Sequence, residues 1–155
     1  MSEATLYTGY SDYDSIVLRW LVKEKEAPLT VKRLGTHTLH MIEPPYLVDR
    51  ELQLFDHWTI VQYMQERYPG EQLMPVDPQV RAQIRQMCVL LREGEGIDYR
   101  AEIAELLDTR YPFLLGDMFT MADVYAGARL VYEKPNSMLL IAYKQRMLGR
   151  VQDVL

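Results

Sequence analysis

The sequence has 155 residues, of which 48% are hydrophobic and 25% charged, and it carries a formal net charge of −5. This balance excludes a disordered chain, and an acidic surface repels phosphate, so direct contact with nucleic acid is not expected. The single cysteine, Cys88, rules out an intrachain disulfide. No apolar run approaches the ~20 residues of a membrane span, and Met1–Ala4 do not begin a signal peptide. We therefore expect a cytoplasmic protein without membrane contact.

The first half of the sequence predicts alternating strands and helices. A β-prone run at 5–8 precedes a turn and a helical pattern, and residues 29–34 indicate a second strand. Residues 46–48 and 52–55 are typical of a hairpin, and Asp56 is a good N-cap for the helix that follows. The expected order is therefore β-α-β, a loop and β-β-α. The buried stripe expected on the last helix is Ile60, Val61, Met64 and Tyr68.

A proline-rich connector separates the two halves. We expect a first domain over 1–70, a linker over 71–78 and a helical domain over 79–155. Asp77 and Pro78 have the pattern of an N-cap followed by proline at the first helical position.

Every long segment of the second half has helical periodicity. Thr120 and Asp123 form a capping-box pattern, and a last helix is predicted to begin near Ser137. Cys88 falls beside an apolar stripe, which predicts a buried, inert thiol. The stripe consists of Val80, Ile84, Met87 and Leu91.

Several strings resemble a known family. Residues 45–50 (PYLVDR), 54–56 (LFD) and 63–69 (YMQERYP) resemble the central part of a glutathione transferase thioredoxin-like domain. Residues 73–78 (LMPVDP), followed closely by Arg81, are similar to the stringent starvation protein A family, the RNA-polymerase-associated branch of that superfamily. The resemblance implies an α/β plus all-α protein, with a thioredoxin-like N-terminal half (β-α-β-β-β-α) and a helical C-terminal half.

The resemblance reaches both ends of the chain, through residues 6–8 and 119–123 and the closing helix at 143–148. The chain is shorter than family members usually are. The shortening is expected at 35–43, where a helix between the second and third strands is nearly gone, and around 93–99.

Transferase chemistry in the resembling family needs a hydroxyl or thiol donor after the first strand and a backbone partner for the ligand beside a cis-proline. Tyr10 and Ser11 are the donor candidates, and the alternative is that both are ordinary turn residues. The resemblance places the cis-proline at Pro45. The residue before it is Pro44, which has no N–H and so cannot donate one of the hydrogen bonds that a strand-like ligand needs.

The third family mark is an acidic residue and then a small hydroxyl residue at a helix N-terminus, where the γ-glutamyl carboxylate binds. This sequence has Asp56 and then His57. His57 could donate to a carboxylate, but we favour a solvent-facing first-turn residue. Two of the three marks are altered, which argues against efficient transferase chemistry and leaves weak glutathione binding as the only cofactor expectation. His37 and His40 complete no zinc pattern, so no metal is expected.

The sequence therefore predicts a non-catalytic transcription regulator that binds RNA polymerase or another protein, as the resemblance implies. The family's contact surface is a proline-histidine-proline cluster, which residues 69–71 replace with Pro-Gly-Glu. A divergent glutathione transferase or glutathione-binding protein is the first alternative, and a dimerisation module without ligand is the second. The partner-binding candidates are Tyr68, Pro69, Gln72, Leu73 and Pro75. A homodimer is the family habit, with Trp58, Tyr63 and Met87 as possible apolar contacts.

Overall fold

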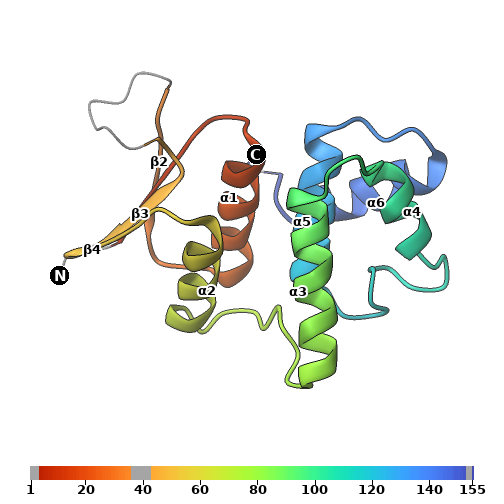
Figure 1. Ribbon diagram of the computed structural model, residues 1–155, viewed down its shortest axis with the longest axis horizontal. Helices are drawn as coiled ribbons and strands as arrows, with labels where there is room; N and C mark the ends of the chain where they lie inside the picture. The colour runs from red at the N-terminus through yellow and green to blue at the C-terminus, as the bar shows by residue number, and fades with distance from the viewer. Residues whose placement is uncertain (1–3, 36–42, 153–154) are drawn as a thin grey trace. The chain divides into compact units, whose positions relative to one another are not determined.

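The protein is described by a computed structural model, which covers residues 4–35, 43–152 and 155 (Figure 1). The chain divides into two compact units, the first made essentially of Met1–Glu71 and the second of Gln72–Gln152. Of the segment 35–43, where we expected a shortened helix, the structure describes only residues 35 and 43. His37 and His40 lie outside the described residues.

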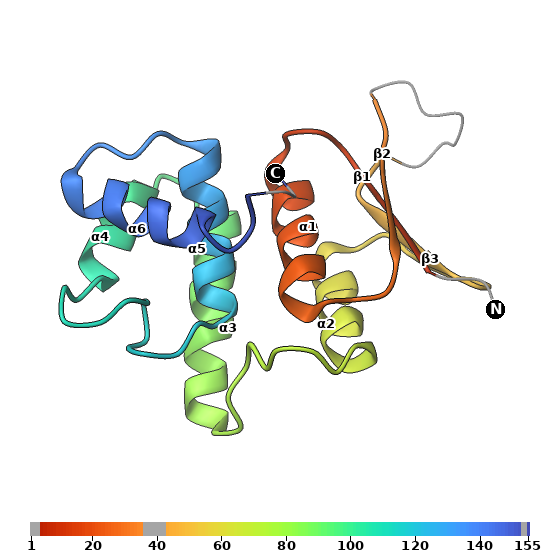
Figure 2. The same cartoon turned by 180° about the vertical axis from the view of Figure 1, so that it is seen from behind.

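The first unit contains a four-stranded sheet in the order β2-β1-β3-β4. β1 is parallel to β2, and the pairs β1–β3 and β3–β4 are antiparallel. Both helices, α1 (Tyr13–Lys25) and α2 (His57–Arg67), lie on the same face of this sheet (Figures 1 and 2). The predicted β-α-β-β-β-α order is confirmed. The strands are β1 (Thr5–Thr8), β2 (Thr30–Arg33), β3 (Tyr46–Asp49) and β4 (Leu52–Leu54).

The core of the first unit follows from the alternation of the strands. Leu6 and Leu47 are register partners on adjacent strands, and both are fully buried. Each such side chain contributes about 1.5–3 kcal/mol through burial. The predicted stripe of α2 is confirmed, because Ile60, Val61, Met64 and Tyr68 are all buried.

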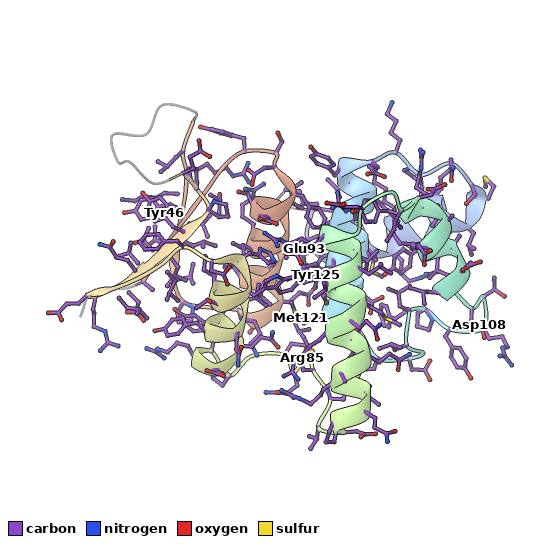
Figure 3. All side chains as sticks on the ribbon, in the orientation of Figure 1. Tyr46, Arg85, Glu93, Asp108, Met121 and Tyr125 are labelled. Carbon is purple, nitrogen blue, oxygen red and sulfur yellow. The ribbon has the colours of Figure 1, made fainter. Side chains whose placement is uncertain are left out.

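The opposite face of the sheet carries an aromatic pair. The rings of Tyr7 on β1 and Tyr46 on β3 stack with centroids 4.7 Å apart, and the Lys32 ammonium lies 5.9 Å from the Tyr7 centroid. Figure 3 shows Tyr46 on the side of the sheet away from α1 and α2. Burial, and then the neighbouring Tyr7, raises the pKa of Tyr46.

The second unit is helical. α5 is its central helix, because every residue from Met121 to Leu130 is buried, and α3 packs along it (Figure 1). The helical C-terminal half is confirmed, as is the final helix, which begins after its cap Ser137. The helices are α3 (Pro78–Glu93), α4 (Tyr99–Leu106), α5 (Met121–Tyr132) and α6 (Met138–Leu148).

Asp123 connects three segments of the second unit. Its carboxylate accepts the Thr120 N–H at 3.0 Å, as the capping-box pattern predicts, and also the Leu114 N–H at 3.0 Å and the Tyr143 hydroxyl at 2.7 Å. Asp123 is fully buried, and desolvation raises its pKa although these donors oppose that shift. The carboxylate is therefore part of the scaffold of this unit.

Arg129 holds the C-terminal end of α3. Its guanidinium donates to the Leu91 carbonyl at 2.6 Å and the Arg92 carbonyl at 2.9 Å, and it lies 4.0 Å from the Tyr99 ring centroid. The last carbonyls of a helix have no partner within the helix, so this side chain satisfies groups that burial would otherwise leave unpaired.

The apolar row of α3 differs in detail from the prediction. The buried residues are Ile84, Cys88 and Leu91, whereas Val80 and Met87 are only half-buried. Cys88 is buried as predicted, and burial raises the pKa of its thiol. A thiol with a raised pKa stays protonated and unreactive near neutral pH. Over the described ranges, no helix is both long enough and apolar enough to cross a bilayer.

Candidate functional site

The turn between β1 and α1 is fixed by side chains of the helix. Asp12 caps α1, and its Oδ2 accepts the Ser15 N–H at 3.1 Å and the Ser15 hydroxyl at 2.8 Å. The Ser15 Oγ in turn accepts the Gly9 N–H at 2.8 Å. A Cβ on Gly9 would lie 2.2 Å from Asp12 Oδ1, so a larger residue at position 9 would disturb the cap.

The side chain of Arg19 holds the backbone of this turn through hydrogen bonds. Its Nη1 donates to the Gly9 carbonyl at 2.7 Å and to Thr8 Oγ1 at 3.0 Å, and its Nη2 donates to the Tyr10 carbonyl at 2.7 Å. The side chain is buried, and desolvation lowers its pKa. No role is predicted for Arg19 from the sequence alone. A charged residue among the buried positions of a helix was the signal that could have indicated one.

Both donor candidates project from this fixed turn. Tyr10 is 60% exposed and Ser11 is also exposed. The Tyr10 backbone is held by Arg19, whereas its ring is presented to solvent. The turn can therefore offer a hydroxyl to a ligand, although it does not enclose one.

The peptide bond between Pro44 and Pro45 is cis, as the resemblance implied. Pro45 directly precedes β3, and both prolines are half-buried. Because Pro44 has no N–H, a ligand placed beside this bond would receive no hydrogen bond from that residue.

His57 is not where we expected it. The prediction of a solvent-facing residue is wrong, since the side chain of His57 is 2% exposed and its Nδ1 lies 3.5 Å from Oδ1 of Asp14 in the first turn of α1. Its ring also packs edge-on against Trp58, with centroids 4.9 Å apart. The cause is the packing of α1 beside α2, which a single-helix pattern does not reveal. His57 therefore does not present its imidazole to a ligand at the α2 N-terminus.

Asp56 already occupies the N-terminus of α2. Its Oδ2 accepts the Thr59 N–H at 2.9 Å and the Thr59 hydroxyl at 2.8 Å, which confirms the predicted N-cap. Asp14, which contacts His57, brings a second carboxylate near the first turn of α2. Asp56 matches the acidic residue of the family pattern, so the departure from that pattern lies in His57 and its carboxylate neighbour, Asp14.

The topology brings the pocket candidates to one end of the sheet. β1 and β4 run in the same direction, and β3 runs opposite to both, so the turn after β1, the start of β3 and the end of β4 share an edge. Tyr10, Pro45 and Asp56 therefore lie at this one end.

The partner-binding candidates do not form one surface. Pro69 and Gln72 are exposed and Pro75 is half-buried, but Tyr68 and Leu73 are buried. Tyr68 continues the buried stripe of α2, and the Leu73 carbonyl accepts the Met121 N–H at 3.0 Å. Naming Tyr68 and Leu73 as partner-binding residues is therefore wrong, because both side chains are buried, as the predicted stripe of α2 already implied for Tyr68.

The segment that replaces the family's proline-histidine-proline cluster is tied to α1. The Lys25 ammonium is buried and donates to the Glu71 carbonyl at 3.0 Å. A Cβ on Gly70 would lie 2.0 Å from the Lys25 carbonyl oxygen, so only glycine fits there. Burial lowers the pKa of Lys25. This position is a fixed part of the first unit.

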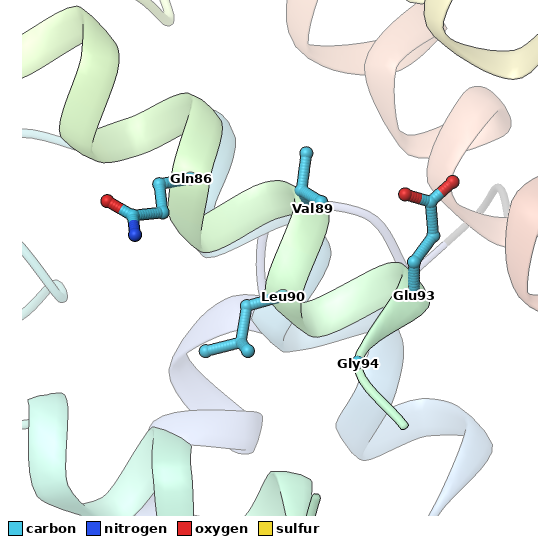
Figure 4. Close-up of a pocket in the computed structure, with 5 residues that line it drawn as sticks. All are labelled: Gln86, Val89, Leu90, Glu93 and Gly94. Atoms are coloured by element: carbon cyan, nitrogen blue, oxygen red, sulfur yellow. The ribbon is translucent and has the colours of Figure 1, made fainter.

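Each unit carries a shallow apolar surface. In the first unit, Trp58 and Tyr63 line a groove beside β4, which is completed by Leu52, Leu54, Thr59, Gln62 and Glu66. In the second unit, α3 presents a surface in which Gln86 and Leu90 project from the same side of the helix (Figure 4). Among the residues that the structure covers, no cluster of His, Cys, Asp and Glu could hold a metal ion.

Comparison with known proteins identifies the family. No family model matches the chain. A stringent starvation protein A homolog from Pasteurella multocida is 32% identical over 154 residues, covering 81% of this chain and 73% of the relative. The chain belongs to the stringent starvation protein A family.

The chain is also similar to glutathione transferases. A glutathione transferase homolog from Burkholderia with bound glutathione has a TM-score of 0.79 at 20% identity, covering 97% of this chain and 93% of the other. Glutathione S-transferase F14 of Arabidopsis thaliana is 25% identical over 78% of this chain and 59% of its own length. These likenesses confirm the predicted fold. This member of the stringent starvation protein A family combines that fold with the altered site described above.

Proposed function

We propose that this chain is a non-catalytic cytoplasmic regulator of transcription that acts by binding a protein partner, for which its family membership favours RNA polymerase. The observation that carries the proposal is the contact of His57 with Asp14. At the position where a transferase needs a small hydroxyl residue for the γ-glutamyl carboxylate, the side chain is buried and faces a carboxylate. The missing N–H of Pro44 also argues against glutathione binding, because that residue cannot donate a backbone hydrogen bond to a ligand.

The test is direct binding of the purified chain to a purified bacterial RNA polymerase holoenzyme, measured by biolayer interferometry. Saturable binding at micromolar concentration or below is the expected result. Absence of binding to core and holoenzyme alike would overturn the polymerase proposal.

We propose further that the chain forms a homodimer, as its family habit implies. The apolar surfaces beside β4 and on α3 are the candidates for burial between copies. Leu52→Glu and Val89→Glu each place a charge on one of these surfaces and should shift the molecular mass from dimer to monomer in light scattering. Met138→Glu, at another exposed position of the second unit, is the control. A monomeric wild type would refute the dimer.

Glutathione binding is the second candidate, and the similarity to transferases favours it. Tyr10 could still offer its hydroxyl from the fixed turn. Isothermal titration with reduced glutathione distinguishes the two functions. Saturable heat at millimolar ligand or below, lost in Tyr10→Phe, would support a thiol-handling protein. No heat, together with polymerase binding, would support the regulator.

A further inference from the structure

Two large aromatic side chains are exposed at the same end of the first unit. Tyr10, after β1, is 60% exposed, and Phe55, after β4, is 53% exposed. β1 and β4 are both hydrogen-bonded to β3, so the two strands lie about 10 Å apart. We call this pair, Tyr10 and Phe55, the aromatic rim. Exposed aromatic residues are frequent anchors in protein interfaces.

The backbone of the aromatic rim is fixed before any partner arrives. Arg19 donates to the carbonyl groups of Gly9 and Tyr10 at 2.7 Å each. Phe55 directly precedes Asp56, whose carboxylate is engaged with Thr59 as the α2 cap. A surface whose backbone is already ordered loses less conformational entropy on binding than a loop that must become ordered.

Each aromatic residue of the rim has an exposed acidic residue close to it in the sequence, Asp12 two positions after Tyr10 and Asp56 directly after Phe55. Within the described part of the chain, the exposed acidic residues at this end are Asp12, Glu43 and Asp56. Lys32 and Arg33, at the end of β2, are exposed basic residues, and Arg19 is buried beneath the turn. A partner segment with positive charge would complement this arrangement, and one with negative charge would be repelled.

We propose that the aromatic rim, with its acidic surround, is the surface on which this chain binds a basic segment of its protein partner, one that carries Arg or Lys beside apolar side chains. The end of the sheet that holds glutathione in transferases is thereby used for a protein. This inference rests on the proposed function and names the surface and the partner chemistry for it. Apolar side chains of the segment pack on Tyr10 and Phe55, and its cations lie over the aromatic faces and near Asp12 and Asp56.

The first experiment uses two short fluorescein-labelled peptides and the full chain. One peptide contains Arg and Leu with Gly and Ser spacers, and the other has Glu in place of each Arg. Fluorescence anisotropy should detect saturable binding of the basic peptide, weakened by added salt, and none of the acidic one. Equal binding of both peptides, or of neither, would overturn the proposal.

Two pairs of variants locate the surface. Tyr10→Ala should weaken binding of the basic peptide about tenfold, whereas Tyr132→Ala, which removes a tyrosine 58% exposed in the second unit, should change nothing. Asp56→Asn keeps a capping oxygen and removes a charge, and should weaken binding several-fold. Asp98→Asn makes the same change at the α4 cap and is its control. Unchanged binding in both Tyr10→Ala and Asp56→Asn would overturn the proposal.

The same variants measured against RNA polymerase holoenzyme separate this inference from the proposed function. If the wild type binds polymerase and Tyr10→Ala and Asp56→Asn bind equally well, the polymerase proposal stands and the surface assignment is wrong. If the wild type does not bind polymerase but binds the basic peptide through these residues, the surface assignment stands and the partner is another protein.

Discussion

Nδ1 of His57 lies 3.5 Å from Oδ1 of Asp14, and this contact joins the first turns of α2 and α1. One half of the pair is an imidazole with almost no solvent exposure, and the other is a partly exposed carboxylate. The two residues are 43 positions apart in the sequence, so no local sequence pattern predicts their contact. The contact uses the side chain that would otherwise face the ligand position of a transferase.

We predict that His57 and Asp14 are energetically coupled. His57→Ala and Asp14→Ala should each lower the free energy of unfolding, and the double variant should lower it by less than the sum, with a coupling energy of about 1 kcal/mol. Urea denaturation of the four proteins measures the cycle. Additivity within about 0.3 kcal/mol would show that the contact contributes nothing to stability.

Gly70→Ala should destabilise the first unit. The added methyl group would lie 2.0 Å from the Lys25 carbonyl oxygen, so the backbone must shift, at a cost of about 1–3 kcal/mol. Thermal unfolding followed by circular dichroism measures the loss.

The matched control is Gly35→Ala, where a Cβ would meet nothing within 4 Å. That variant should change stability by no more than about 0.5 kcal/mol. Equal effects of the two substitutions would indicate that Gly70 is not required by its contact with α1. A large effect of Gly70→Ala would show that the backbone of α1 excludes any side chain at position 70, including the histidine of the family's cluster.

The fold was predictable because its signals are local. Caps such as Asp56 and Asp77 specify where helices start, and apolar periodicity specifies which side is buried. A cis bond at Pro45, in contrast, came from the family resemblance, because base rates alone favour trans.

The site was less predictable because its decisive contacts join residues far apart in the sequence. Nothing near His57 indicates that α1 would bring Asp14 against it, and nothing near Leu73 indicates that its carbonyl would accept the Met121 N–H. Lys25 is similar, since its buried ammonium donates to the carbonyl of Glu71, which lies 46 positions away in the sequence. Tertiary packing decides whether such side chains are buried and what they contact, and local sequence patterns do not reveal that packing.

Arg129→Ala should destabilise the second unit by about 2–3 kcal/mol, because two carbonyls at the end of α3 lose their charged donor while remaining largely buried. Arg129→Lys should recover only part of the loss, since an ammonium cannot reproduce the planar two-point contact. Chemical denaturation measures both variants. Arg85→Ala, at an exposed position of α3 (Figure 3), is the control and should be nearly neutral. Full stability of Arg129→Lys would mean that charge alone accounts for the contact.

Asp123 should give the second unit a distinctive dependence on pH. Desolvation raises the pKa of this carboxyl in the folded state, and the Tyr143 hydroxyl, the Thr120 N–H and the Leu114 N–H oppose the shift. The folded protein therefore binds the proton more tightly than the unfolded chain does, for which the carboxyl pKa is about 3.9. Its contribution to stability is full below that value and declines as the pH rises towards the folded pKa.

Tyr143→Phe tests this account without removing the carboxyl. The variant loses the 2.7 Å hydrogen bond, so it should be less stable at neutral pH by about 1–3 kcal/mol. The Asp123 pKa should rise further, because a donor that favours the ionised form is gone. The stability difference between wild type and Tyr143→Phe should therefore shrink as the pH falls and Asp123 becomes protonated in both proteins. Tyr132→Phe, which alters an exposed tyrosine of the same helix bundle, should show no such trend. A difference between wild type and Tyr143→Phe that stays constant from neutral to acidic pH would mean that the hydroxyl contributes by packing rather than through the charge of Asp123.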